Sequence, residues 1–140
     1  MTVWSKRLSL GCLIAYRQLK LADCILLKDE IFQFDDRIRY FGFLDNRQGM
    51  VVSELKNKSE SHASEERLVR DLTFFKGAMA SWGLYFGRVR YSVVAHDSLK
   101  IIMIPIETGL LIITAEPSFS LTKVEEISEK LHERSLTGKV

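Results

Sequence analysis

Three histidines and a few carboxylates are the residues with which this chain could do chemistry. His96 is followed by Asp97, which could orient an imidazole whose pKa lies near neutrality. The pair precedes Ser98 between two apolar runs, where Asp and Ser are ordinary turn formers. His62 falls in a polar stretch, and we place His132 on the solvent side of the last helix. The sequence therefore predicts no catalytic residue and no enzymatic activity.

Three aspartates could form a cation site. Asp35 and Asp36 precede an aromatic-rich segment and Asp45 follows it, but adjacent carboxylates here are more typical of a solvated helix end. The histidines and cysteines do not have the spacing of a metal site. Neither phosphate-binding motif, GxxxxGK[ST] or GxGxxG, occurs. We expect no metal and no cofactor.

The two cysteines do not indicate redox chemistry. Cys12 and Cys24 are too far apart in sequence for a CxxC pair or a zinc knuckle. On one helix they would lie about 18 Å apart, which is too far for a disulfide. We expect both to be small buried side chains.

Composition narrows the class of protein. The chain has 140 residues, 46% of them hydrophobic, with 20 Lys and Arg against 18 Asp and Glu. Such a chain can bury enough surface to fold as one domain, and it is too apolar to be disordered. Arg88 and Arg90 alternate with Val89 and Tyr91, a pattern that could suit RNA, but two arginines are too few. We expect no nucleic-acid partner.

The apolar segments are too short for a membrane span. Residues 8–16 form a run that ends at Arg17 without a convincing cleavage site. The longest uncharged run, Gly77 to Gly87, is well short of the ~20 residues that a membrane helix needs. The sequence predicts a cytoplasmic protein.

Hydrophobic periodicity predicts a single α+β domain over residues 1–140. The expected elements are a helix at 8–32, a hairpin at 38–55, a helix at 64–86, a three-stranded meander at 88–116 and a helix at 122–134. This α-β-β-α-β-β-β-α order predicts one five-stranded antiparallel sheet covered by helices.

Several residues mark the expected boundaries. Gly49 is placed for a positive φ in the hairpin turn, and Gly87 is a natural end to the second helix. Ser64 is placed to cap the start of that helix, and Thr122-x-x-Glu125 reads as a capping box for the last one. Pro105 should mark a strand end, a bulge or a position without a ladder bond.

The second helix has more apolar surface than a sheet requires. One stripe is Leu68, Leu72, Phe75 and Met79, and a second is Phe74, Ala78, Trp82 and Tyr85. Covering a sheet needs one stripe, so the second indicates a subunit interface. In the strand that follows, alternation places Val89, Tyr91, Val93 and Ala95 on one face.

The element order resembles the roadblock/LC7 modules and the wider profilin-like group that includes longin domains. The resemblance covers residues 8–131 and is carried by Ile38–Asp45, a strand that ends in an Asp-led turn, and by Lys100–Ile106 with Leu110–Ile113. Small archaeal proteins of this type share a similar hairpin and an Ile-Pro-Ile strand.

This resemblance implies a non-enzymatic scaffold. Roadblock modules pair through the helix between strands two and three and through the edge of strand three, often beside small GTPases. It thus implies a homodimer, an unidentified protein partner such as a small GTPase, and an interface on this chain. The interface residues would be Phe74, Ala78, Trp82, Tyr85, Arg88, Arg90, Ser92 and Val94.

A PAS-like sensor of small molecules is the alternative function. Such domains also build a curved antiparallel sheet with helices over one face. In that case Tyr40, Phe43 and Tyr91 would line an internal pocket.

Overall fold

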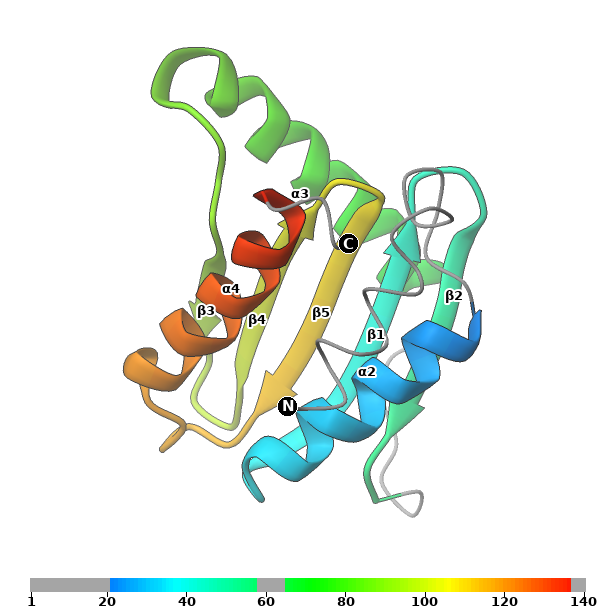
Figure 1. Cartoon of the computed structure of the whole chain (residues 1–140), viewed down its shortest axis with the longest axis vertical. Helices are drawn as coiled ribbons and strands as arrows, with labels where there is room; N and C mark the ends of the chain where they lie inside the picture. Colours follow the sequence, from blue (N-terminus) through cyan, green and yellow to red (C-terminus); the bar gives the residue numbers. More distant parts are fainter. Residues whose placement is uncertain (1–20, 58–64, 137–140) are drawn as a thin grey trace.

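The computed structural model describes residues 21–57 and 65–136 (Figure 1). In chain order the elements are α2 (Leu21–Phe34), β1 (Ile38–Asp45), β2 (Gly49–Leu55), α3 (Glu65–Phe86), β3 (Ser92–Ala95), β4 (Lys100–Ile106), β5 (Gly109–Ala115) and α4 (Leu121–Leu136). The predicted α+β order is confirmed. The predicted helix start at residue 8, Cys12, His62 and the Ser64 cap lie outside the described residues.

All five strands form one antiparallel sheet in the order β2-β1-β5-β4-β3. The central pair is β1 with β5, which aligns Ile38 with Ala115 and Asp45 with Gly109. Strands β2 and β3 lie at the two edges. The sheet therefore has a buried centre formed by segments that are distant in sequence.

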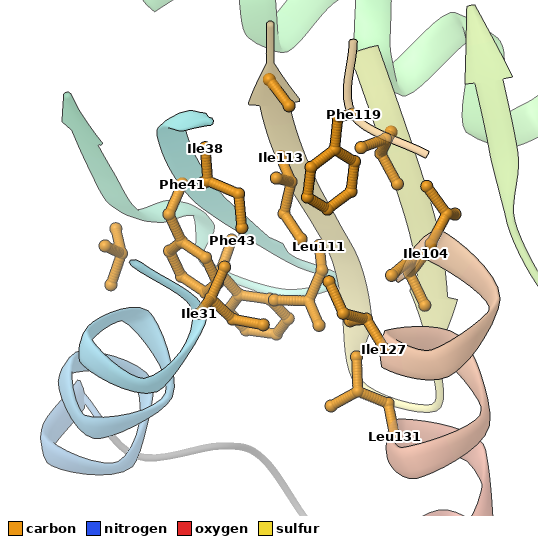
Figure 2. Packing of buried hydrophobic residues seen from close by; sticks show 14 of the residues in the cluster. Ile31, Ile38, Phe41, Phe43, Ile104, Leu111, Ile113, Phe119, Ile127 and Leu131 are labelled. Carbon is orange, nitrogen blue, oxygen red and sulfur yellow. The ribbon is translucent and has the colours of Figure 1, made fainter. Parts of the chain in front are cut away.

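Helices cover the sheet on both faces. Helices α2 and α4 lie side by side on one face, and α3 crosses the other (Figure 1). Phe43 and Ile127, for example, belong to the cluster on the α2–α4 side (Figure 2). Leu72 and Met103 belong to the cluster on the α3 side. Alternate side chains of each strand point to opposite faces, so one run of apolar residues serves both layers.

Helix α2 contributes Cys24 and Ile31 to the core on its side of the sheet. The Cys24 thiol is free and fully buried, as the sequence predicts for this residue. Burial, assisted by the charges of Asp23 and Asp45, raises the pKa of Cys24 to about 12. The thiol stays protonated and behaves as a small apolar side chain.

Glycines form the turns where the sequence predicts them. Gly49 has a φ of 79° and Gly87 a φ of 87°, both in the left-handed region that favours glycine. The Oδ1 atom of Asp45 accepts backbone hydrogen bonds from Arg47 at 2.8 Å and Gln48 at 3.0 Å. The Asp-led turn is therefore fixed by its own carboxylate.

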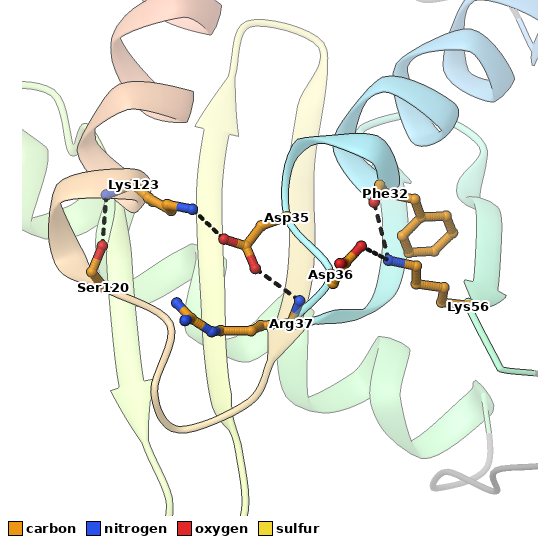
Figure 3. Close-up of polar contacts among 7 residues, drawn as sticks. All are labelled: Phe32, Asp35, Asp36, Arg37, Lys56, Ser120 and Lys123. Atoms are coloured by element: carbon orange, nitrogen blue, oxygen red, sulfur yellow. Dashed lines mark hydrogen bonds and ion pairs between the residues drawn. The ribbon is translucent and has the colours of Figure 1, made fainter.

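The start of α4 differs from the prediction. Lys123 donates its backbone N–H to both the hydroxyl and the carbonyl of Ser120, so Ser120 is the N-cap. The predicted capping box from Thr122 to Glu125 is wrong because the N-cap lies two residues earlier, at Ser120. The Lys123 side chain pairs with Asp35, which also accepts the Arg37 N–H and so joins α4 to the α2–β1 connection (Figure 3).

Strand β3 is shorter than predicted. The sequence suggests a strand from Arg88, but β3 spans Ser92–Ala95 only, and residues 87–91 form an irregular connector. The predicted common face is also wrong, because Val89 packs with the α3-side cluster while Tyr91 and Val93 pack with the α4-side cluster. Pro105 explains the shortening, since it cannot donate to the ladder where a longer β3 would lie.

His132 is not on the solvent side of the last helix. It is 1% exposed, and its Nε2 atom lies 2.9 Å from the Pro105 carbonyl oxygen. Its Nδ1 atom lies 3.1 Å from the Ser128 hydroxyl on the preceding turn of α4. The prediction failed because the ring has polar partners inside the fold, the Pro105 carbonyl and the Ser128 hydroxyl.

Candidate functional site

The residues singled out for chemistry do not converge. His96 and Asp97 are exposed in the β3–β4 turn, where the His96 N–H bonds the Leu99 carbonyl. Asp35 is paired with Lys123, whose ion pair together with the Arg37 N–H lowers the pKa of Asp35. In residues 21–57 and 65–136, no group of three or more His, Cys, Asp or Glu could hold a metal ion.

Tyr40, Phe43 and Tyr91 do not line one pocket. Tyr40 belongs to the cluster on the α3 side of the sheet, and Phe43 belongs to the cluster on the opposite side. The Tyr40 hydroxyl is bonded to the Ser53 hydroxyl at 2.8 Å. The lining predicted for a sensor is therefore divided between two packed layers.

One open depression lies at the end of the sheet near the α2–β1 connection. Its volume is about 260 Å³, and its walls are mostly charged or polar. Lys56 spans its rim, bonding the Phe32 carbonyl at 3.1 Å and lying 3.9 Å from Asp36 (Figure 3). It has neither the enclosure nor the apolar lining of a typical metabolite site.

Helix α3 displays the second apolar stripe that the sequence predicts. Phe74 is 83% exposed, Trp82 53% and Tyr85 80%, while Ala78 beside them is partly buried. The other side of the helix contacts the sheet through Leu72 and Met79. The stripe thus faces away from the fold of its own chain.

Two further apolar residues extend this surface and were not in the predicted interface. Leu84 is 84% exposed and Phe86 is 85% exposed. Leu72, Met79 and Phe86 are spaced by seven, so they lie on one face of the helix, yet only the first two are buried. The end of α3 therefore projects beyond the sheet (Figure 1). The heptad spacing predicts that the three residues share a face. It does not predict where the sheet beneath them ends.

The edge strand β3 lies next to this helix. The Ser92 hydroxyl lies 3.7 Å from the Met79 sulfur, and Val94 packs with the cluster beneath α3. Arg88 and Arg90 are exposed on the connector. Of the described strands, β4 alone pairs with β3, so its other edge has backbone groups available for another strand. We use the name α3–β3 surface for the predicted interface residues together with the two added here: Phe74, Ala78, Trp82, Leu84, Tyr85, Phe86, Arg88, Arg90, Ser92 and Val94.

Comparisons with known proteins give a structural likeness without sequence similarity. No family model matches the chain, and no curated protein does. The solved structure titled "MglB with tetrameric arrangement" superposes with a TM-score of 0.62 at 12% identity, covering 99% of this chain and 94% of that one. The gliding protein MglB from Thermus thermophilus gives a TM-score of 0.59 at 14% identity over 98% and 94%.

The chain has the roadblock/LC7-type fold. The predicted resemblance is confirmed at the level of the fold, and the similarity covers nearly the whole of both chains. In the described part of the chain, no helix is long and apolar enough to cross a membrane.

Proposed function

We propose that residues 1–140 form one roadblock-like domain that acts as a homodimeric, non-enzymatic protein-interaction module. The exposed aromatic stripe of α3 carries this proposal, together with the edge of β3 that pairs with no other described strand. A monomeric soluble protein rarely leaves so many large apolar side chains together on its surface.

The α3–β3 surface supplies two kinds of contact for self-association. Phe74, Trp82, Tyr85 and Phe86 are aromatic side chains that can bury about 150–250 Å² each, a large part of the ~800 Å² per partner of a standard interface. The His96 N–H bonds the Leu99 carbonyl, and because bonded pairs alternate along an antiparallel ladder, the backbone groups of Val94 and Ser92 face β4. Those of Val93 and Ala95 thus point outward, where a second strand could add to the sheet.

A small GTPase in the cytoplasm is the partner class that the roadblock/LC7 resemblance favours. The two copies of a dimer would present one composite surface to it. Binding is measured by titrating the protein into purified small GTPases from the same source, each loaded with GDP or with a non-hydrolysable GTP analogue. Saturable binding to one of them supports this partner class, and absence of binding to all of them contradicts it.

Replacing Trp82 with glutamate tests the dimer. A buried interface Trp typically contributes about 2 kcal/mol or more to association, roughly a 30-fold change in Kd, so the variant should sediment as a monomer at micromolar concentration. Leu121→Glu is the matched control, because Leu121 is also 53% exposed but lies on α4, on the opposite face of the sheet. A wild-type protein that is monomeric at these concentrations, or a Trp82→Glu variant that associates unchanged, contradicts the proposal.

A further inference from the structure

Two side chains of α4, Ser128 and His132, bond the backbone just before the start of β3 and opposite it on β4. The register aligns Ser92 with Met103, so two residues further back Arg90 would face Pro105. That pair cannot complete a ladder, because proline has no N–H. Instead the Ser128 hydroxyl donates to the Arg90 carbonyl at 2.8 Å, and His132 Nε2 lies 2.9 Å from the Pro105 carbonyl. Ser128 thus satisfies the Arg90 carbonyl, which proline could not bond, and His132 satisfies the Pro105 carbonyl opposite it.

The two side chains resemble a nucleophile and a base, but they are not placed for catalysis. The Ser128 hydroxyl lies 3.1 Å from His132 Nδ1. Each residue is only 1% exposed, so neither can reach a substrate. Their contacts join three parts of the fold, which are α4, β4 and the connector from Gly87 to Tyr91.

The hydrogen bonds define the protons of the closed arrangement. His132 Nε2 faces a carbonyl oxygen, so it carries the hydrogen of the neutral ring and Nδ1 is an acceptor. The hydroxyl of Ser128 has one hydrogen, and both the Arg90 carbonyl and Nδ1 face it. A second ring proton would add one hydrogen bond to Ser128, but it would also bury a charge. No carboxylate among the described side chains pairs with the ring. Burying an unpaired charge costs several kcal/mol, more than one added charge-assisted hydrogen bond returns.

The charges around His132 also oppose a proton. The connector contributes Arg90 and Arg88, both positive, and β4 contributes one ionisable residue, Lys100, which is held by the Phe119 carbonyl at the far end of the strand. Strand β5 has no ionisable residue. On α4 itself Glu125 bonds the Tyr91 hydroxyl, and Glu129 is exposed. Burial and then the like charges of Arg90 and Arg88 lower the pKa of His132, outweighing its hydrogen bonds to Pro105 and Ser128.

We infer that Ser128 and His132 form a proton-sensitive clamp that holds the α3–β3 connector against α4 and releases it on acidification. A histidine released from this site regains its ordinary pKa of about 6.5. Protons then bind more strongly to the open form than to the closed form. Opening therefore becomes more favourable as the pH falls below about 6.5.

The clamp would regulate self-association, a consequence that rests on the proposed function. The connector begins where α3 ends at Phe86 and leads directly into the edge strand at Ser92. Release of the connector frees these two parts of the α3–β3 surface to move relative to each other. Association through both parts at once should thus weaken at acidic pH.

Amide hydrogen exchange by NMR tests the clamp in the full chain. The observable is the opening constant of the Ser92 amide, the first amide of β3 that faces β4 beyond the connector, at about pH 7.5 and about pH 5.5, corrected for the intrinsic pH dependence of exchange. If the closed form stays neutral, opening should increase up to about tenfold between these pH values. His132→Gln keeps an N–H donor for Pro105 but cannot titrate, so its opening should not depend on pH. His96→Gln is the control, because His96 is exposed in the β3–β4 turn.

The variants separate the clamp from the dimer. Ser128→Ala should raise opening at both pH values because it removes the bond to Arg90. A wild-type opening constant that does not depend on pH, or an equal pH dependence in His132→Gln, overturns the clamp. Sedimentation of the same samples reports association separately. A chain that is monomeric throughout contradicts the proposed function, while the exchange data still decide for or against the clamp.

Discussion

The strands present apolar side chains on both faces of the sheet, but helices cover the two faces unequally. On the face under α2 and α4, Phe41, Phe43 and Phe119 are fully buried. On the other face, α3 buries Leu72 and Met79 but leaves Trp82 and other large apolar side chains exposed. We call the face under α2 and α4 the closed face and the face under α3 the open face. The closed face therefore supplies most of the stability of a single chain, and the exposed side of α3 on the open face is available for association.

The largest effect should come from removing an aromatic ring on the closed face. Phe43→Ala should lower the free energy of unfolding by about 3–5 kcal/mol, since it leaves a cavity among fixed neighbours. Phe74→Ala on α3 is the matched variant, and it should change monomer stability by no more than about 0.5 kcal/mol. Urea denaturation at low protein concentration measures both. Equal losses of unfolding free energy in the two variants would mean that the two faces contribute equally to the stability of the monomer.

A pair of glycines gives the next contrast. A Cβ atom on Gly109 would lie 2.2 Å from the Leu44 carbonyl oxygen, whereas a Cβ atom on Gly77 in α3 would meet open space. Gly109→Ala should destabilise by about 1–3 kcal/mol because the backbone must move. Gly77→Ala should stabilise by about 0.5–1 kcal/mol through helix propensity. Thermal unfolding of both variants tests the opposite signs.

The smallest effect concerns the N-cap that stabilises the start of α4 on the closed face. Ser120→Ala should cost about 1 kcal/mol, because it removes the hydroxyl that accepts the Lys123 N–H. Thr122→Ala should cost much less, because Thr122 is inside the helix and exposed. A larger loss of unfolding free energy for Thr122→Ala than for Ser120→Ala in denaturant titrations would support the capping box that the sequence predicts.

Local patterns were sufficient to predict the order of the elements and several boundaries. The positive φ values of Gly49 and Gly87 follow from residue type and position alone. The exposed stripe of α3 follows from helical spacing, because Phe74 and Trp82 do not share a face with Leu72 and Met79. These features depend on neighbours close in sequence, which a single sequence records well.

The errors arise where distant segments meet. The shortening of β3 depends on Pro105 facing Arg90, and that register is set by the pairing with β4. His132 is buried against the Pro105 carbonyl, which is 27 residues away in sequence. The exposure of Phe86 depends on where the sheet ends beneath α3. No local pattern contains this information.

The central pairing of β1 with β5 also constrains the order in which the chain can fold during synthesis. Ile38 pairs with Ala115, and Asp45 pairs with Gly109, so these contacts close long loops and are slow to form. The ribosome must release the chain as far as Ala115 before the middle of the sheet can assemble. Helix α3 emerges earlier, with its aromatic side chains present before there is a complete sheet to receive them. A nascent chain is therefore most exposed to aggregation in this interval, and it gains protection only when β5 arrives.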